Sequence, residues 1–470
     1  MNEQVLKLCE AVREAGGRAM LVGGWVRDYL LGIESKDFDI EVYGVEPDRL
    51  RTLLETLAQV NTVGEHFSVY KLAFRNSESN SSTADLKAEV SNLKPQVAER
   101  FEIDVSIPRR ESKAGRGHRA FIIEGDPAMS FQEAARRRDF TMNAILYDPL
   151  TDEVVDPFDG ARDLSRRVLR AVAADTFVED SLRVLRAVQF AARFEMTVDP
   201  ETADLCRGID LADLPRERVW GEVEKLLTLA ERPSLGLDTA LELDVLDKLL
   251  PEVRALAGCR MATDSDIEID AFTHTKRALD EAVKLTRDLS TAKRITVMLA
   301  VLCSDLGRPF DESGDGSFDY AEASIAPAQA VIKRFGLYTL DGYNVRAIAL
   351  ALVREHLKPR DFYRERDRIT DGDFRRLAQV VNLDLLYRVA KAHSLALAPP
   401  PVAEEWFIER ARALGVDEGP PRPLLQGRHL LKIGFTPGPR MGEVLRRVYE
   451  LQLDGEVTNL EEALAAARLA

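Results

Sequence analysis

The sequence is poor in cysteine and contains no long hydrophobic run. Its four cysteines, Cys9, Cys206, Cys259 and Cys303, form no CxxC pair. A disulfide scaffold and a structural zinc site are therefore not expected, and all four are predicted to be buried apolar residues. The densest apolar run, residues 295–303, is far shorter than the ~20 residues that cross a bilayer. We expect no membrane partner.

An excess of basic residues is also missing. The chain of 470 residues carries 79 acidic and 64 basic side chains, a net charge of −15, which by itself argues against a nucleic-acid partner. Arginines nevertheless crowd residues 109–170, and a local basic surface can form on an acidic protein. Net charge therefore leaves the class of partner open.

No export signal is visible at the N-terminus. Glu3, Lys7, Glu10 and Arg13 recur in a pattern typical of a charged amphipathic helix, and no apolar signal core accompanies them. Cysteines without pairing motifs suit a reducing compartment. Together these features predict a cytoplasmic location.

Length and patterning predict several domains of two kinds. A chain of 470 residues is about three times the ~150 residues of one domain. Residues 21–22, 38–42 and 101–107 are predicted strands, and the last alternates apolar and polar side chains, as in a sheet with one wet face. From about residue 163 onward, apolar residues recur every three or four positions, which predicts helices. Proline-rich residues 398–401 and 419–423 are typical of linkers, and polar residues 76–99 of a loop or insertion.

A glycine pair and two aspartates are the first features that carry chemistry. Gly23 and Gly24 open the segment GGWVRD, and glycines let a backbone approach a phosphate closely. Asp37 and Asp39 follow in KDFD; alternate strand residues face the same side, so both carboxylates are presented together. Adjacent carboxylates repel each other, and hard oxygen ligands of this kind suit Mg²⁺ bound together with substrate phosphates.

A third carboxylate follows on the next alternating strand. Asp104 shares the polar side of residues 101–107 with Glu102 and Ser106, opposite the apolar residues. It could complete a carboxylate trio with Asp37 and Asp39.

Three later motifs, together with the two above, resemble a known family. They are RRDFTMNA at residues 137–144, DPFDG at residues 156–160 and EDSLRVLR at residues 179–186. In order and spacing, all five resemble the motifs of bacterial tRNA CCA-adding enzymes and poly(A) polymerases. The resemblance covers residues 21–190, and ordered agreement of several motifs is far more specific than any one of them.

The resemblance implies roles for these residues in nucleotidyl transfer. Asp37 and Asp39 would hold Mg²⁺, and Asp104 would act as the base or a third ligand, because the family's third carboxylate precedes an arginine by five residues, as Asp104 precedes Arg109. Guanidinium groups bind phosphate oxygens and a carboxylate accepts from a ribose hydroxyl. The nucleotide would accordingly be bound by Gly23, Gly24, Arg27, Arg138, Asp139, Asn143, Asp180, Arg183 and Arg186.

Asp180 and Arg183 are the implied base-reading pair. Residues three apart on a predicted helix share one face. A carboxylate can accept from the exocyclic amine of cytosine or adenine while an arginine donates to the neighbouring ring nitrogen, and uracil and guanine present the opposite polarity. Wrong bases would leave buried polar groups unpaired, which gives strong discrimination.

Beyond the motifs, the resemblance implies an α/β nucleotidyltransferase head, a small mixed sheet with helices, followed by an all-α neck, body and tail. The expected limits are 1–150 for the head, 151–255 for the neck, 256–400 for the body and 401–470 for the tail. Residues 423–464 resemble the tail of CCA-adding enzymes that carry an HD domain, which favours these over poly(A) polymerases.

The body resembles a degenerate HD domain. An intact one chelates a metal with a histidine, a His-Asp pair and a distant aspartate, but Ser304 replaces the histidine before Asp305. We therefore predict that His274, Asp305 and His356 are held by packing or hydrogen bonds, which argues against phosphohydrolase activity.

The reaction implied is addition of C, C and A to the tRNA 3′ end from CTP and ATP, with Mg²⁺ and release of pyrophosphate. The tRNA would bind by its acceptor end, and no stable protein partner is expected. CC-only addition, A-only addition and poly(A) synthesis remain alternatives, because the base-reading pair would be common to all. A catalytically silent RNA-binding protein and an HD phosphohydrolase are alternatives of a different class, disfavoured by the intact Asp37–Asp39 pair and by Ser304, respectively.

Overall fold

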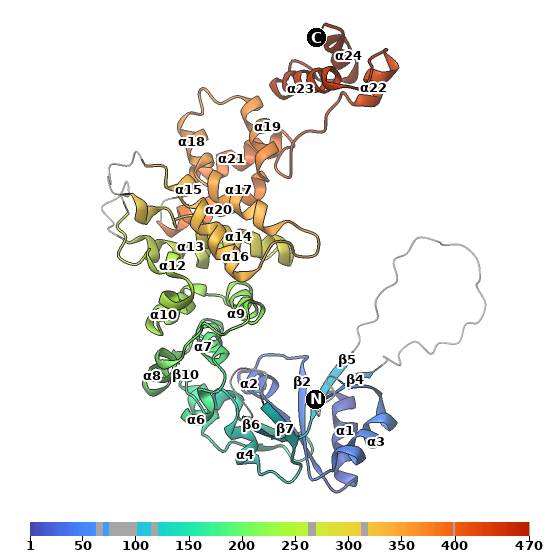
Figure 1. The fold of residues 1–470 in the computed structure, drawn as a ribbon, viewed down its shortest axis with the longest axis vertical. Coiled ribbons are helices and arrows are strands. Elements are labelled where there is room, and N and C mark those ends of the chain that lie inside the picture. Colours follow the sequence, from blue (N-terminus) through green and yellow to red (C-terminus); the bar gives the residue numbers. More distant parts are fainter. Residues whose placement is uncertain are drawn as a thin grey trace, which may run out of the picture. The chain divides into compact units, whose positions relative to one another are not determined.

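The computed structural model describes residues 1–62, 69–74, 101–113, 121–261, 269–311, 318–397 and 400–469. The chain divides into two compact units, which are described separately (Figure 1). The first unit comprises residues 1–187 and 196–213, and the second comprises residues 188–195 and 214–470. The predicted segment 76–99 lies outside the described residues.

A seven-stranded mixed sheet forms the centre of the first unit. In spatial order its strands are β3 (Gln59–Thr62), β4 (Val69–Phe74), β5 (Phe101–Ser106), β2 (Phe38–Tyr43), β1 (Arg18–Val22), β8 (Leu146–Asp148) and β9 (Glu153–Val155). The β2–β5 pairing is parallel, and the other pairings in this sheet are antiparallel. Smaller pairs are β6 (Arg109–Lys113) with β7 (Phe121–Gly125), and β10 (Val168–Leu169) with β11 (Thr197–Val198).

Helices cover both faces of this sheet. The described helices of the first unit besides α7 (Leu182–Arg193) are α1 (Glu3–Glu14), α2 (Gly24–Leu30), α3 (Pro47–Leu57), α4 (Phe131–Arg136), the 3₁₀ helix η1 (Thr141–Asn143), α5 (Gly160–Ser165), α6 (Ala174–Phe177) and α8 (Pro200–Gly208). Helices α1 and α3 lie side by side on one face (Figure 1). There Leu8 and Leu54 pack against Ile40 of β2 and Val105 of β5, whereas Met20 and Tyr43 face the α4 side.

Strand β2 illustrates why the sequence folds in this way. Its alternate residues Phe38, Ile40 and Val42 belong to the core beneath α1 and α3. Asp39 and Glu41 therefore point to the opposite face, on the side of α4. Helix α4 begins with a capping box, in which Ser130 and Glu133 satisfy each other's backbone amides. The turn that follows it brings Arg137 and Arg138 to that face, where both lie beside Glu41.

The second unit is helical: within the described part of the chain, no named strand follows β11. Its helices are α9 (Arg216–Leu229), α10 (Pro233–Glu242), α11 (Val245–Leu249), α12 (Pro251–Arg254), α13 (Ala271–Leu285), α14 (Thr291–Cys303), η2 (Arg308–Phe310), α15 (Tyr320–Ala323), α16 (Ile325–Phe335), α17 (Val345–Glu355), α18 (Lys358–Arg364), α19 (Asp371–Val380), α20 (Leu383–Ala396), α21 (Val402–Ala413), α22 (Gly427–Lys432), α23 (Pro439–Asp454) and α24 (Leu460–Leu469). Helix α7 (Leu182–Arg193) runs from the first unit into the second.

Helix α14 lies at the centre of the second unit. Its residues 295–303, the densest apolar run of the sequence, are all buried, and α13, α17 and α20 pack against it. Among the described residues, no helix is long and apolar enough to cross a bilayer. Cys9, Cys206 and Cys303 are buried as predicted, and Cys259 is half-buried.

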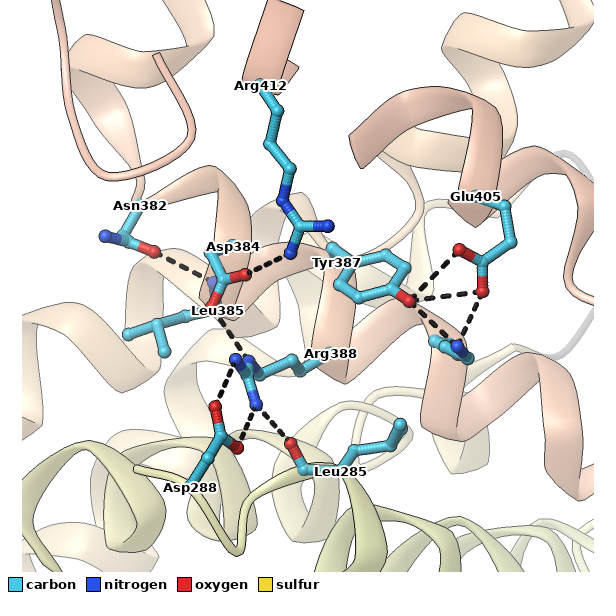
Figure 2. A network of polar contacts seen from close by, with 10 residues as sticks. Leu285, Asp288, Asn382, Asp384, Leu385, Tyr387, Arg388, Glu405 and Arg412 are labelled. Carbon is cyan, nitrogen blue, oxygen red and sulfur yellow. Dashed lines mark hydrogen bonds and ion pairs between the residues drawn. The ribbon is translucent and has the colours of Figure 1, made fainter. Parts of the chain in front are cut away.

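A polar network joins α20 to its neighbours (Figure 2). Arg388 of α20 binds Asp288, just beyond α13, at 2.6 Å and Asp384 of α20 at 2.8 Å. The carboxylate of Glu405 on α21 accepts from Tyr387 and Lys391 of α20. These bonds hold α20 in register with α13 and α21.

The α/β head and the helical remainder agree with the predicted fold class. The sequence did not reveal β3, β4, β8 and β9 of the central sheet; β8 and β9 have three residues each and therefore carry few alternating positions. The four domain limits stay predictions.

Candidate active site

Asp39 and Asp104 face each other across the parallel β2–β5 pair. Their Cα atoms are direct partners in the strand register, so both side chains emerge on the same face of the sheet. Asp37 stands immediately before β2, which begins at Phe38 as predicted. The trio of carboxylates predicted from the sequence is thus brought together, with Asp104 rather than Glu102 opposite Asp39.

This cluster has an excess of negative charge. Burial raises the pKa of the Asp39 carboxyl, and the nearby carboxylates of Asp104 and Asp37 raise it further. The positive charge of Arg138 opposes this rise. Lys71 on β4 lies 3.4 Å from Asp104, but both side chains are partly exposed, so this pair is screened by water. Three carboxylates with so little compensation fit a divalent cation, for which hard oxygen ligands are the usual donors.

Gly23 brings the glycine turn against these carboxylates. Its φ of +68° is a conformation that favours glycine. A Cβ at this position would lie 3.1 Å from Nη1 of Arg138 and 3.8 Å from Oδ2 of Asp39. The turn, the arginine of the RRDFT motif and the Asp-x-Asp motif therefore meet at one point, as the sequence predicts. Gly24 begins α2.

Arg27 is buried rather than open to a ligand. It is 4% exposed, its Nε donates to Asp28 at 2.8 Å, and its Nη1 donates to the side-chain oxygen of Asn143 at 3.0 Å. Its bonds join the first turn of α2 to η1. This arrangement fits a residue that holds the glycine turn in place.

Asp139 and Asn143 continue that network. One carboxylate oxygen of Asp139 accepts from the Phe140 amide at 2.8 Å and from Asn143 at 3.0 Å. The other accepts from Nε of Arg186 at 2.6 Å. Burial would raise the pKa of Asp139, but Arg186 and these hydrogen bonds hold it below its usual value. In this structure Asp139 binds protein groups with both oxygens, so direct contact with a ribose stays a prediction.

Asp180 and Arg183 lie at the start of α7. The predicted helix contains both, but α7 begins at Leu182, whose amide donates to the Asp180 carboxylate at 3.1 Å. Asp180 thus caps this helix, consistent with the preference of aspartate for helix starts. The guanidinium of Arg183 donates to the backbone oxygens of Thr176 at 2.6 Å and of Arg137 at 2.5 Å. These bonds fix its orientation beside the RRDFT turn.

Sequence reasoning missed Glu41, which is 1% exposed and binds Arg137 at 2.8 Å. It continues the alternation of Asp37 and Asp39 on β2, and this period of two was the available signal.

In the second unit, three imidazoles and a carboxylate gather in the core. His274 and Asp305 are joined by a hydrogen bond of 2.7 Å, and the rings of His274 and His356 each lie beside that of His393, with centroids 5.0 Å and 5.3 Å away. His393 was missed, although three of the chain's six histidines meet here. His274 and Asp305 are indeed held by a hydrogen bond, and Nδ1 of His356 donates to the backbone oxygen of Val353 at 2.7 Å.

An HD-type metal does not fit this cluster well. One ligand atom each from His274, Asp305 and His393 lies within 4.8 Å of the others, which an ion could span. However, Asp305 also binds Nε of Arg308, whose guanidinium already supplies a positive charge. Burial would raise the pKa of Asp305, yet Arg308 and His274 hold it well below its usual range. The charge of Asp305 is thus balanced by protein groups.

Comparison with known proteins agrees with the geometry of the head. Residues 19–170 match the family model described as the poly A polymerase head domain, and residues 195–256 match the probable RNA and SrmB-binding site of polymerase A. Together with the opposed carboxylates, the first match defines a nucleotidyltransferase of the poly(A) polymerase class.

Relatives resolve the class further. The multifunctional CCA protein of Xanthomonas oryzae pv. oryzae is 32% identical over 442 residues, covering 91% of this chain and 96% of the relative. That of Stenotrophomonas maltophilia R551-3 is 35% identical over 348 residues, covering 72% and 75%. The chain belongs to the family of class II CCA-adding enzymes.

A solved structure supports the same fold. The Bacillus stearothermophilus CCA-adding enzyme in complex with CTP superposes with a TM-score of 0.66 at 20% identity, over 100% of this chain and 98% of the other. A divalent metal is expected for nucleotidyltransferases of this family. The carboxylates of Asp37, Asp39 and Asp104 are suitable donors for it.

Proposed function

We propose that this enzyme adds C, C and A to the 3′ end of tRNA, using CTP and ATP and releasing pyrophosphate. The observation that carries the proposal is the placement of Asp39 opposite Asp104, with Gly23 and Arg138 beside Asp39. Each addition forms a bond between the 3′ oxygen of the RNA and the α-phosphorus, and it breaks the bond between the α- and β-phosphates. The 3′ hydroxyl gives its proton to a base, for which Asp104 is the proposed group, and the electron pair of the broken bond leaves with pyrophosphate.

Mg²⁺ is the proposed cation. Asp37 and Asp39 would hold it, and when bound it would neutralise phosphate oxygens and favour the deprotonated 3′ hydroxyl. Asp104 is proposed as the base or a further ligand. Its nearness to Asp39 supports both roles, because either role requires a carboxylate on this face of the sheet.

Arg138 is the proposed contact to the triphosphate. Its side chain is 21% exposed, and its hydrogen bond to the Asn143 backbone is a long one of 3.4 Å, so donors remain for phosphate oxygens. The proposed support for nucleotide binding comes from four residues that hold this turn in place: Arg27, Asp139, Asn143 and Arg186. Their hydrogen bonds to one another leave fewer groups for direct contact with the nucleotide.

Asp180 and Arg183 are proposed to read the base. Both are partly exposed, and Arg183 uses one hydrogen on each of two terminal nitrogens for backbone oxygens, which leaves further donors in a fixed plane. A fixed donor next to a carboxylate favours cytosine and adenine over uracil and guanine. The proposal places the reaction in the cytoplasm, where its tRNA substrate would be found.

Extension of a tRNA that lacks its last three nucleotides tests this function. The protein is incubated with Mg²⁺ and with CTP, ATP, both or neither, and the products are resolved at single-nucleotide length. Three additions that stop and need both nucleotides are expected. Two additions from CTP alone with no further step, or A added only to a tRNA ending in CC, would identify a split-function enzyme.

Two other results of the same assay would overturn the proposal in different ways. A long ladder of A would identify a poly(A) polymerase. No extension, with tRNA still bound, would identify a silent RNA-binding protein.

A further inference from the structure

Glu41 is a buried carboxylate beside the proposed site to which the reaction gives no role. It lies two residues after Asp39 on β2, on the same face, and it is 1% exposed. A buried carboxylate is costly unless charged or polar partners surround it. Glu41 has three such partners: Tyr43 donates to it at 2.6 Å, Arg137 at 2.8 Å, and Arg138 lies 3.8 Å away.

The two arginines beside Glu41 are held differently. Arg137 is fixed at several points: its Nη2 binds Glu41, its Nε donates to the Ala134 backbone at 3.2 Å, and its own backbone oxygen accepts from Arg183. Among the described residues, Arg138 makes one long hydrogen bond, to the Asn143 backbone at 3.4 Å, and a long ion pair of 3.8 Å with Glu41, and it lies toward Gly23 and Asp39. The neighbouring guanidinium groups repel each other, and the Glu41 carboxylate lies where it offsets that repulsion.

We propose that Glu41 is a positioning residue that acts through Arg137 on both halves of the nucleotide site. On one side it keeps Arg137 away from the phosphates, so that Arg138 is the arginine aimed at them. On the other side it fixes the backbone oxygen on which the base-reading Arg183 rests. This inference rests on the proposed function of Arg138 and Arg183, and it adds a link between phosphate binding and base selection.

Glu41→Gln tests the inference because glutamine keeps the size of the side chain and removes its charge. With a tRNA acceptor, KM for CTP and for ATP is expected to rise about tenfold, because Arg138 is no longer held in place. The kcat at saturating nucleotide is expected to stay within about threefold, because Asp39 and Asp104 are untouched. Discrimination of CTP against UTP is expected to fall at least about fivefold, because Arg183 loses a fixed support.

Tyr43→Phe is the matched control. It removes a hydrogen bond to the same carboxylate but leaves the charge of Glu41 and both arginines. KM and discrimination are expected to stay within about twofold of wild type. Equal effects of Tyr43→Phe and Glu41→Gln would point to a general packing role and would overturn the inference.

A double-mutant cycle separates action through Arg137 from a direct action. If Glu41 works through Arg137, then Glu41→Gln combined with Arg137→Met should raise KM no more than about twofold beyond the larger single effect. Multiplied effects would contradict the link. Should Glu41→Gln not fold, Glu41→Asp keeps the charge with a shorter reach, and wild-type KM and discrimination in that variant would likewise sink the proposal.

The wild-type assay keeps the two proposals apart. Failure of wild-type protein to extend tRNA would remove the proposed function. Normal wild-type extension with an unchanged Glu41→Gln variant would remove only the role of Glu41.

Discussion

Two clusters of ionisable groups in this chain balance their charge in opposite ways. In the head, Asp37, Asp39 and Asp104 gather on one sheet face, and Arg138 and Lys71 are described cations near them. Burial and the other two carboxylates raise the pKa of Asp39, and these two cations oppose the rise. In the helical unit, the single carboxylate of Asp305 is enclosed by cationic or potentially cationic groups.

The difference shows what each cluster still needs. The negative charge of the head carboxylates is not balanced by the protein groups described around them. A metal ion bound together with a triphosphate would balance it. The Asp305 cluster contains its own cation in Arg308 and is buried away from water, as expected of a structural ion pair. A group of histidine and aspartate residues in a core therefore does not by itself indicate a metal site.

The largest expected effect breaks the head cluster. Asp39→Asn should lower the rate of nucleotide addition at least about 1,000-fold, because the cation loses a charged ligand worth several kcal/mol in the transition state. The rate is measured by single-turnover extension, with tRNA binding and thermal unfolding followed in parallel. Both should remain close to wild type, since Asp39 is exposed to solvent.

Glu102→Gln is the control for that experiment. Glu102 lies on the same strand two residues before Asp104 and is exposed. The rate should change less than about twofold. A loss here, with normal activity in Asp104→Asn, would mean that the third carboxylate has been assigned to the wrong residue.

The next effect breaks the buried ion pair. Asp305→Asn should reduce the free energy of unfolding by about 3 kcal/mol, because the half-buried Arg308 guanidinium would lose the buried carboxylate that pairs with it. Denaturant unfolding at neutral pH measures this loss. Asp238→Asn, which removes an exposed ion pair with Lys276, should cost less than about 1 kcal/mol.

Chelation distinguishes this account from a metal site. Treatment of the wild-type protein with a strong chelator should leave unfolding of the helical unit unchanged. A lowered unfolding temperature, restored by Zn²⁺ or Mn²⁺, would show that Asp305 holds an ion after all.

A smaller effect concerns pH. Burial lowers the pKa of His356 to about 4, whereas an unfolded histidine titrates near its ordinary value of about 6.5. The unfolded chain therefore takes up the proton first, so this group lowers stability as pH falls below about 6.5, on the order of 2 kcal/mol by pH 5. His356→Gln should reduce the slope of unfolding free energy against pH between 7 and 5. An unchanged slope would contradict a neutral buried His356.

The smallest expected effect concerns the competition between Lys71 and a cation at the head cluster. Lys71 lies 3.4 Å from Asp104 and competes with a cation for that carboxylate. Lys71→Met should therefore lower the Mg²⁺ concentration needed for half-maximal extension about twofold, a modest change because both side chains are partly exposed. A higher Mg²⁺ requirement would show instead that Lys71 helps to bind the phosphates.

Local pattern was enough to find much of the head. Alternation placed Asp104 on the polar face of its strand, and the Asp-x-Asp spacing marked β2, since both signals lie within a few residues. The pairing that sets Asp39 opposite Asp104 joins distant parts of the chain, and the separate strands do not encode it visibly.

Other site features depend on tertiary packing. Glu41 reads in the sequence as one more residue on a wet strand face, and only the arrival of Arg137 explains its burial. His393 joins the histidine cluster because α13 packs against α20, which no local pattern records. Asp180 was placed inside a helix because helix boundaries are the least certain part of such a prediction.

The parallel pairing of β2 with β5 also sets the earliest point during synthesis at which the acidic pair of the site can form. A ribosome must release the chain through Ser106 before Asp104 can join Asp39, so the earlier nascent chain has no complete acidic pair. Pairing between distant strands is slow to form, and a slip of one residue would turn Asp104 into the apolar layer beneath the sheet. A misaligned molecule would thus lose activity and stability together, which exposes it to proteolysis before it can act on RNA.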